Sequence, residues 1–185
     1  MKKSRLSRCL AIAAIIIMSS FAASAKALVP FYKIDNTSWE GKYYCAPIGE
    51  SEAPDDWYTE DFDDSTWGNI TGPLYLSDGT WQANYYSYWV RCYFSIDELT
   101  STKTYTFYAC HDDGCRAYIN GVEIYNNDGV EAECSAIVLS EEAIAALKTG
   151  TNVLCVFVSD SGGGDAYMDF GLYENDLQDM ITESD

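Results

Sequence analysis

The chain has 185 residues and a formal net charge of −18, because 29 Asp and Glu outnumber 11 Lys and Arg. An acidic surface of this kind repels nucleic acid and anionic lipid headgroups. It excludes nucleic-acid binding and favours neutral ligands, cations or basic partners. Aromatic residues make up 15% of the chain, which is enough apolar area for a packed core, so the acidity does not indicate disorder.

The first 27 residues have the three-part order of a secretory signal peptide. Basic residues at positions 2–8 precede an apolar run over residues 10–18, and small residues at 23–27 form the cleavage site. The apolar run is shorter than the length that a transmembrane helix needs. We therefore expect no membrane insertion and a secreted or otherwise extracytoplasmic protein, in the periplasm or at the cell surface, that begins at Lys26 or Leu28.

Residues 28–185 predict a single all-β domain, with its core at about residues 35–173 and an acidic C-terminal tail. Residues 89–96 alternate in hydrophobicity, which predicts a strand with two distinct faces. Its expected core face is Val90, Cys92, Phe94 and Ile96, and its other face is Trp89, Arg91, Tyr93 and Ser95.

Tight turns separate the remaining predicted strands. Asn120-Gly121 is the strongest short signal for a β-hairpin. Ser140 as N-cap and Gly150 as C-cap bound one short helix. Residues 152–158 are apolar on both faces, which predicts a central, fully buried strand. The other predicted strands are residues 105–110, 134–139 and 167–172.

Six cysteines follow the predicted signal peptide, an even number that permits three disulfides in an exported protein. Cys110 and Cys115 flank a four-residue turn, so we expect them to pair across two adjacent antiparallel strands. The alternative is that both are small buried residues. His111 is the only histidine and no CxxC pair occurs, which excludes zinc-finger and multi-histidine metal sites.

Five segments, in this order, resemble the galactose-binding-like jelly-roll domain, which occurs as the sugar-binding domain of family-2 glycoside hydrolases and as an accessory module in glycan-degrading proteins of gut bacteria. They are DFDDSTW (61–67), YWVRCYF (88–94), HDDGCRAYINGVEI (111–124), ALKTGTNVLCVFV (146–158) and GGGDAYMDFGL (162–172). The resemblance implies a jelly-roll β-sandwich of about eight strands. In those hydrolases the domain is not catalytic, so the resemblance implies binding rather than catalysis.

The residues themselves also argue against an enzyme. Any Ser-His-Asp triad would need His111, which lies in a predicted turn, and no GxSxG segment supplies a nucleophile. Carboxylate pairs of the kind used by glycosidases are uninformative in a chain with 29 acids. We therefore predict no catalytic residues.

Asp112 and Asp113 resemble the consecutive-Asp motif of calcium-dependent adhesin domains of the protective-antigen type, in which Ca²⁺ also binds sugar hydroxyls. Ca²⁺ takes six to eight oxygen ligands, so the pair would need further donors. Asp165 and Asp169 are a second choice. The alternative is a turn in which Asp side chains accept hydrogen bonds from backbone amides and Gly114 supplies a positive φ. Ca²⁺ is the only cofactor we consider.

Aromatic residues in segment 75–88 form the predicted ligand site. Trp81, Tyr85 and Tyr86 lie among amide and hydroxyl side chains, and Trp57 is a further candidate. Such a composition suits sugars, whose apolar C–H faces stack on aromatic rings. The alternative is that these rings are core residues.

These observations predict a secreted, non-catalytic carbohydrate-binding module for neutral glycans, acting alone or within a larger surface glycan-handling assembly. Two alternatives stay open. One is a structural or protein-interaction module without a sugar site, and the other is a calcium-dependent adhesin.

Overall fold

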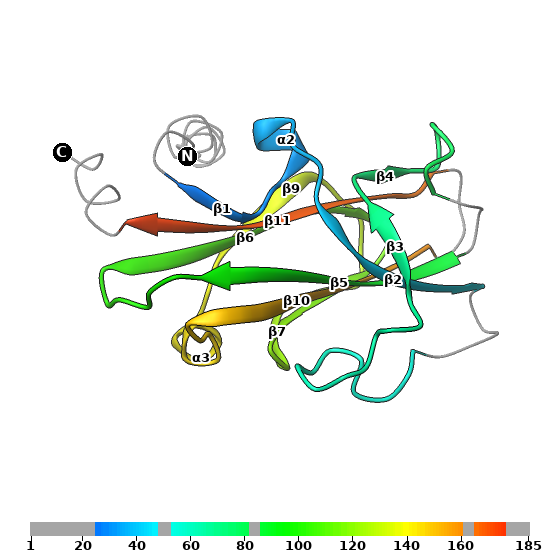
Figure 1. The fold of residues 1–185 in the computed structure, drawn as a ribbon. Helices are drawn as coiled ribbons and strands as arrows, with labels where there is room; N and C mark the ends of the chain where they lie inside the picture. Colours follow the sequence, from blue (N-terminus) through cyan, green and yellow to red (C-terminus); the bar gives the residue numbers. More distant parts are fainter. Residues whose placement is uncertain (1–24, 48–52, 82–85, 161–164, 177–185) are drawn as a thin grey trace, which may run out of the picture.

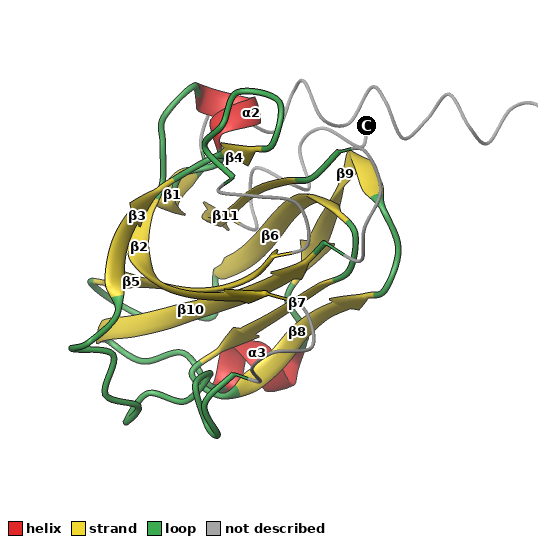
Figure 2. Ribbon diagram, turned by 90° about the vertical axis from the view of Figure 1, so that its right-hand side faces the viewer, coloured by secondary structure: helices red, strands yellow, loops and turns green. Residues whose placement is uncertain are grey.

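Two antiparallel β-sheets pack face to face in the computed structural model (Figures 1 and 2), which describes residues 25–47, 53–81, 86–160 and 165–176. The five-stranded sheet has the order β1-β11-β6-β9, with β4 also paired to β11, and the six-stranded sheet has the order β3-β2-β5-β10-β7-β8. The predicted all-β sandwich is therefore confirmed. Within the described residues, no helix is long and apolar enough to cross a membrane.

The five-stranded sheet consists of β1 (Lys26–Val29), β4 (Leu74–Tyr75), β6 (Lys103–Asp112), β9 (Glu131–Val138) and β11 (Tyr167–Asp176). The six-stranded sheet consists of β2 (Glu40–Pro47), β3 (Gly68–Thr71), β5 (Tyr86–Ile96), β7 (Cys115–Ile119), β8 (Val122–Asn127) and β10 (Gly150–Ser159). Two short helices are described, α2 (Tyr32–Asp35) and α3 (Glu141–Ala145). The predicted N-cap of α3, Ser140, is confirmed, but the predicted C-cap is wrong, because Ala146 caps the helix and Gly150 is the first residue of β10.

The core lies between the sheets and is built from the faces that the sequence pattern predicts. On β5 the expected residues Val90, Cys92, Phe94 and Ile96 lie in the core, and Tyr88 joins them. β10 pairs with β5 on one side and β7 on the other, so residues 152–158 form the predicted central strand. The hairpin at Asn120-Gly121 also forms, with positive φ angles of 48° and 93° at its two turn residues.

The N-terminal segment that contains α2 covers the outer face of the five-stranded sheet (Figure 2). Phe31 stacks on Tyr108 with a centroid distance of 5.5 Å. The Tyr173 hydroxyl accepts a hydrogen bond from the backbone N–H of Phe31 and donates one to Asp35, at 3.0 and 2.8 Å. Gly171 makes this approach possible, since a Cβ atom there would lie 2.5 Å from the Phe31 Cβ.

Residues 53–67, which we call the covering segment, pack on the outer face of the six-stranded sheet (Figure 1). Trp57 and Trp67 of this segment are buried, and they form an apolar cluster with Trp89 of β5. Tyr58 stacks on Tyr118 of β7 with a centroid distance of 4.7 Å. The segment has no helix or strand of its own, so side-chain contacts of this kind hold it on the sheet.

Arg91 of β5 lies under the covering segment and is fully buried. Its Nε donates to Asp64 at 2.8 Å, and its Nη1 donates to the backbone carbonyls of Thr59, at 2.9 Å, and Trp57. Its Nη2 donates to the Tyr93 hydroxyl at 3.1 Å. A buried guanidinium is tolerated only when it is paired and hydrogen-bonded. The covering segment supplies those partners to Arg91, and Arg91 in turn holds the segment on the sheet.

Replacing Arg91 with Met should therefore destabilise the protein strongly, because Asp64 and the two carbonyls would lose their donor. We expect a loss of about 3–5 kcal/mol in the free energy of unfolding, measured by denaturant titration. Arg116→Met is the matched control, since Arg116 makes an exposed ion pair with Asp128 at 3.7 Å. That change should cost less than about 1 kcal/mol. Equal costs for the two variants would contradict the role assigned to Arg91.

The predicted pairing of Cys110 with Cys115 is wrong, because Cys110 forms a disulfide with Cys134 of β9, with a Cα–Cα distance of 4.3 Å. β6 and β7 belong to different sheets, so the chain crosses the sandwich between the two cysteines instead of forming a hairpin. Cys110 faces the outer cluster beside Phe31, whereas Cys115 faces the core and has a free thiol.

Reduction of this disulfide should lower stability, because it closes a loop with a sequence separation of 24 residues. For a loop of that length, Cys134→Ser should cost about 3–4 kcal/mol of unfolding free energy. Peptide mapping without reductant should recover the segments of Cys110 and Cys134 linked together. A link between Cys110 and Cys115, or free thiols at both Cys110 and Cys134, would refute this pairing.

Candidate functional site

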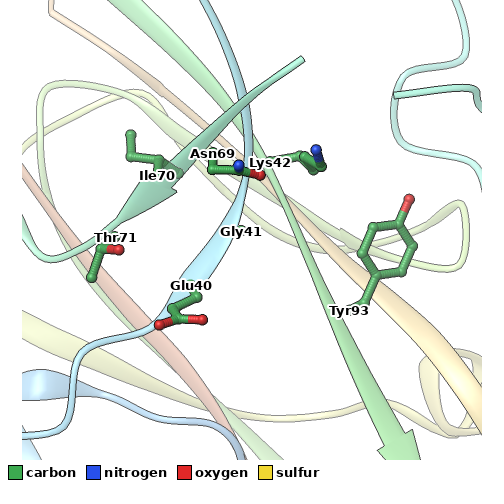
Figure 3. Close-up of a pocket in the computed structure, with 7 residues that line it drawn as sticks. All are labelled: Glu40, Gly41, Lys42, Asn69, Ile70, Thr71 and Tyr93. Carbon is green, nitrogen blue, oxygen red and sulfur yellow. The ribbon is translucent and has the colours of Figure 1, made fainter. Parts of the chain in front are cut away.

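A groove lies on the outer face of the six-stranded sheet, where β3, β2 and β5 are neighbours (Figure 3). Its volume of about 540 Å³ falls within the range of about 300–1,000 Å³ that is common for small-ligand sites. It is lined by Glu40, Gly41, Lys42, Asn69, Ile70, Thr71 and Tyr93.

The strand register explains why polar side chains gather there. Glu40 and Lys42 are two positions apart on β2, so their side chains share one face of the sheet. On β3, Asn69 is the partner of Lys42 and Thr71 is the partner of Glu40. Directly opposite residues have Cβ atoms about 4.5–5.5 Å apart. The four side chains therefore form two rows across two strands.

Tyr93 of β5 forms the aromatic wall of the groove, and 48% of it is exposed. Its hydroxyl donates to Asp64 at 2.6 Å and accepts from Arg91 at 3.1 Å. Partial burial and the hydrogen bond to the Asp64 carboxylate raise the pKa of Tyr93, so the hydroxyl stays protonated at neutral pH. These two hydrogen bonds fix the ring while leaving it open to a ligand.

The polar side chains in the two rows are available for ligand contacts. Among the described residues, Glu40, Lys42, Asn69 and Thr71 make no side-chain hydrogen bond or ion pair. A carboxylate, an ammonium, an amide and a hydroxyl thus surround a fixed aromatic ring. This set of donors and acceptors can hold a ring that carries several hydroxyl groups.

The predicted ligand site around Trp81 is wrong in its main residue. Trp81 is 1% exposed and packs in the core, edge to face with Tyr88 at a centroid distance of 4.7 Å. Its backbone N–H donates to Tyr75 at 3.0 Å, a contact that closes the turn after β4. Because the ring is enclosed, it cannot stack on a ligand.

The other predicted aromatic residues do not form a second site within the described residues. Trp57 is 7% exposed and belongs to the covering segment, so its predicted exposure is also wrong. Tyr85 lies outside the described residues. Tyr86 is the first residue of β5, and its side chain lies outside the described part. The sequence did indicate that Tyr93 could be exposed, because Tyr93 lies on the face of residues 89–96 that was not expected to face the core.

Asp112 and Asp113 lie where the chain passes from β6 to β7, and both are partly buried. Burial, a hydrogen bond with Asp113 and the negative charges of Asp113, Asp165 and Asp160 raise the pKa of Asp112 to about 6. The described residues contain no group of three or more His, Cys, Asp or Glu placed to hold a metal ion. Residues 161–164 lie outside the described part, so the calcium site stays a prediction.

Two further titratable residues have structural partners. Asp169 is buried and accepts hydrogen bonds from the Trp39 indole and the backbone N–H of Lys33, at 3.2 and 3.1 Å. Its pKa rises to about 6 because of burial. His111 is also buried, and its ring nitrogens contact the Asp113 carbonyl at 2.6 Å and the Tyr125 hydroxyl at 2.9 Å. Both side chains hold the fold together.

No protein-family model matches the sequence, and no curated protein matches it significantly. Solved structures of family-2 glycoside hydrolases do share its fold. A family-2 member from Bacteroides cellulosilyticus aligns with 83% of this chain at a TM-score of 0.57 and 13% identity. A family-2 β-glucuronidase aligns with 83% of this chain at a TM-score of 0.57 and 16% identity. A β-glycosidase from Bacteroides vulgatus aligns with 74% of this chain at a TM-score of 0.55 and 16% identity.

The aligned region covers only 21%, 18% and 19% of those three chains, so this chain spans about a fifth of their length. At these sequence identities the likeness shows the fold alone. The protein is therefore a β-sandwich that is structurally similar to one domain of family-2 glycosidases.

The raised pKa of Asp112 gives a testable pH dependence. The ordinary value is 3.8, so the folded protein binds this proton more tightly than the unfolded chain does. The contribution of Asp112 to stability is present below about pH 4 and is lost as the pH rises through 6. Asp113→Asn removes the neighbouring charge, so it should lower the Asp112 pKa and reduce that loss.

Carbon-13 NMR of the side-chain carboxyl groups measures this titration directly. The matched control is Asp97→Asn, because Asp97 is exposed and is not among the groups that shift Asp112. A titration midpoint for Asp112 that is the same in Asp113→Asn as in the wild type would show that Asp113 does not raise it.

Proposed function

We propose that this protein is a secreted, non-catalytic carbohydrate-binding domain for neutral glycans and that the groove is its binding site. The observation that carries the proposal is the Tyr93 ring, which is 48% exposed and fixed by two hydrogen bonds at the edge of a groove lined by polar side chains. Sugar rings present apolar C–H faces to aromatic rings and hydroxyl groups to polar side chains.

The structural likeness to family-2 glycosidases supports this proposal at the level of the fold. In the hydrolases that align, the shared region is about a fifth of the chain. A fold does not by itself determine function, so the groove has to carry the argument about binding. The galactose-binding-like sugar-binding domain is the part of such enzymes that we propose as the counterpart.

Export is also part of the proposal. The sequence pattern of residues 1–27 supports it, and β1 helps to choose between the two cleavage positions. Lys26 and Ala27 pair with Glu174 and Tyr173 of β11. Cleavage after Ala25 would keep these pairs, whereas cleavage after Ala27 would remove them, so we favour a mature chain that begins at Lys26.

Tyr93→Ala should weaken glycan binding, because it removes the aromatic wall. Stacking on an aromatic ring contributes about 1–3 kcal/mol, on the scale measured for nucleic-acid bases, which is roughly a 5- to 150-fold change in affinity. Affinity gel electrophoresis with soluble galactomannan, xyloglucan, arabinoxylan, laminarin and pectic galactan measures the effect. Tyr93→Phe keeps the ring and should retain most of the binding.

Tyr32→Ala is the matched control, because Tyr32 is another tyrosine with 37% exposure, on α2 and away from the groove. It should bind as the wild type does. If none of the five polysaccharides retards the wild-type protein, or if Tyr93→Ala and Tyr32→Ala are retarded equally, the proposal fails.

A further inference from the structure

The two rows of polar side chains lead to a more specific conclusion about the ligand, which rests on the proposed function. We propose that the groove selects an uncharged sugar unit with free hydroxyl groups at two opposite edges of its ring. One edge is held by Lys42 and Asn69, and the other by Glu40 and Thr71. The aromatic ring of Tyr93 contacts the C–H face of the same unit.

The spacing of the rows fits one sugar ring rather than one hydroxyl group. Residues two apart on a strand are separated by about 6.4–6.8 Å. The rows Lys42–Asn69 and Glu40–Thr71 are separated by this distance along β2 and β3. One hydroxyl group needs only one partner at about 2.7–2.8 Å, so a second row of polar side chains leaves room for a second hydroxyl group. A ring with hydroxyl groups on both edges can reach the two rows at once.

The chemistry of the two rows is complementary. Lys42 supplies only donors, and the Asn69 amide supplies both a donor and an acceptor. The ionised carboxylate of Glu40 supplies only acceptors, and the Thr71 hydroxyl supplies both. Hydroxyl groups can donate and accept, so they satisfy both rows. Hydrogen bonds to the two charged groups are the stronger ones, roughly twice the strength of neutral hydrogen bonds.

Lys42 differs from the other basic residues of the described chain. Lys26, Arg91, Lys103, Arg116 and Lys148 each form an ion pair with a carboxylate. The Lys33 ammonium donates to a backbone carbonyl at 3.4 Å. Lys42 has neither kind of partner within the described residues, although the protein carries 29 acidic residues. Its ammonium is therefore available to a ligand.

Charge in and around the groove disfavours an anionic sugar. Within the groove the Glu40 carboxylate balances the Lys42 ammonium, so the site has no net charge of its own. A uronic acid that reached Lys42 would bring its carboxylate into the groove that also holds the Glu40 carboxylate. It would also approach a protein with a net charge of −18. An uncharged sugar meets neither repulsion and still hydrogen-bonds to both charged groups.

The Tyr93 ring adds a rigid surface next to these rows. Its hydroxyl is already hydrogen-bonded to Asp64 and Arg91, so the ring loses little freedom when a ligand stacks on it. In Figure 3 the ring lies to the right of both rows, with Lys42 and Asn69 in the upper part of the view and Glu40 and Thr71 in the lower left. The sugar face and its two edges therefore have separate partners.

Two pairs of methyl glycosides test the selectivity, because the members of each pair differ only at C6. They are methyl β-glucoside against methyl β-glucuronide, and methyl β-galactoside against methyl β-galacturonide. Titration of the labelled protein, followed by backbone amide NMR, should shift the signals of residues 40–42 and 69–71. We expect at least one uncharged glycoside to bind at least tenfold more tightly than its uronide.

Substitutions in the two rows test the assigned contacts. Lys42→Met and Glu40→Gln should each weaken binding of that uncharged glycoside at least tenfold. Glu40→Gln should in addition reduce the preference for the uncharged glycoside over its uronide, because it removes the negative charge that repels the uronide carboxylate. Lys26→Met is the control, since it removes a lysine that pairs with Asp97 away from the groove, and it should have no effect.

The outcomes separate this inference from the proposed function. Tighter binding of both uronides would overturn it. So would unchanged binding in Lys42→Met and Glu40→Gln, or unshifted amides at residues 40–42 and 69–71 while a polysaccharide is still retarded in a Tyr93-dependent way. In the last two cases the proposed function would stand, whereas tighter binding of both uronides would leave a carbohydrate-binding domain but contradict its preference for neutral glycans. If no polysaccharide is retarded at all, the proposed function fails and this inference fails with it.

Discussion

The contacts of one buried guanidinium, that of Arg91, determine how the outer face of the six-stranded sheet is organised. A charge in this position is costly unless every donor has a partner. Asp64 and two backbone carbonyls of the covering segment provide those partners. The segment has no strand or helix of its own. Without Arg91 it would keep the packing of its aromatic residues, the hydrogen bond from Tyr93 to Asp64 and the ion pair of Glu60 with Lys148.

The same contacts connect the fold to the groove. Asp64 accepts hydrogen bonds from both Arg91 and Tyr93, so the residue that holds the covering segment also orients the aromatic wall. Arg91 and Tyr93 are two positions apart on β5 and share one face, yet the first is fully buried and the second is 48% exposed. Tyr93 lines the groove and contacts Asp64, so the groove lies next to the covering segment on the same face of the sheet.

The strand pattern of the sequence predicts much of the sandwich but little of what covers its outer faces. Alternation identifies the core face of β5 because Val90, Phe94 and Ile96 are apolar, whereas Arg91 and Ser95 on the other face are polar. It cannot show that Trp57 would pack over Arg91, since that contact joins residues 34 positions apart. Local spacing also led to the wrong disulfide, because Cys110 and Cys115 are close in sequence but belong to different sheets. For Trp81, composition alone does not distinguish an exposed ring from a buried one.

Both sheets have an outer face that is closed by a segment outside the sheet, and this arrangement explains where a ligand can bind. The N-terminal segment with Phe31 closes the five-stranded sheet, and the covering segment closes the centre of the six-stranded sheet. Apolar residues on these outer faces are used to hold the two segments. Polar residues at the β2–β3 edge, such as Glu40 and Lys42, have no such segment above them and no partner within the described residues. The other described basic groups are engaged with carboxylates or a backbone carbonyl, so this open edge is where the described structure leaves an ammonium and a carboxylate for the ligand contacts proposed above.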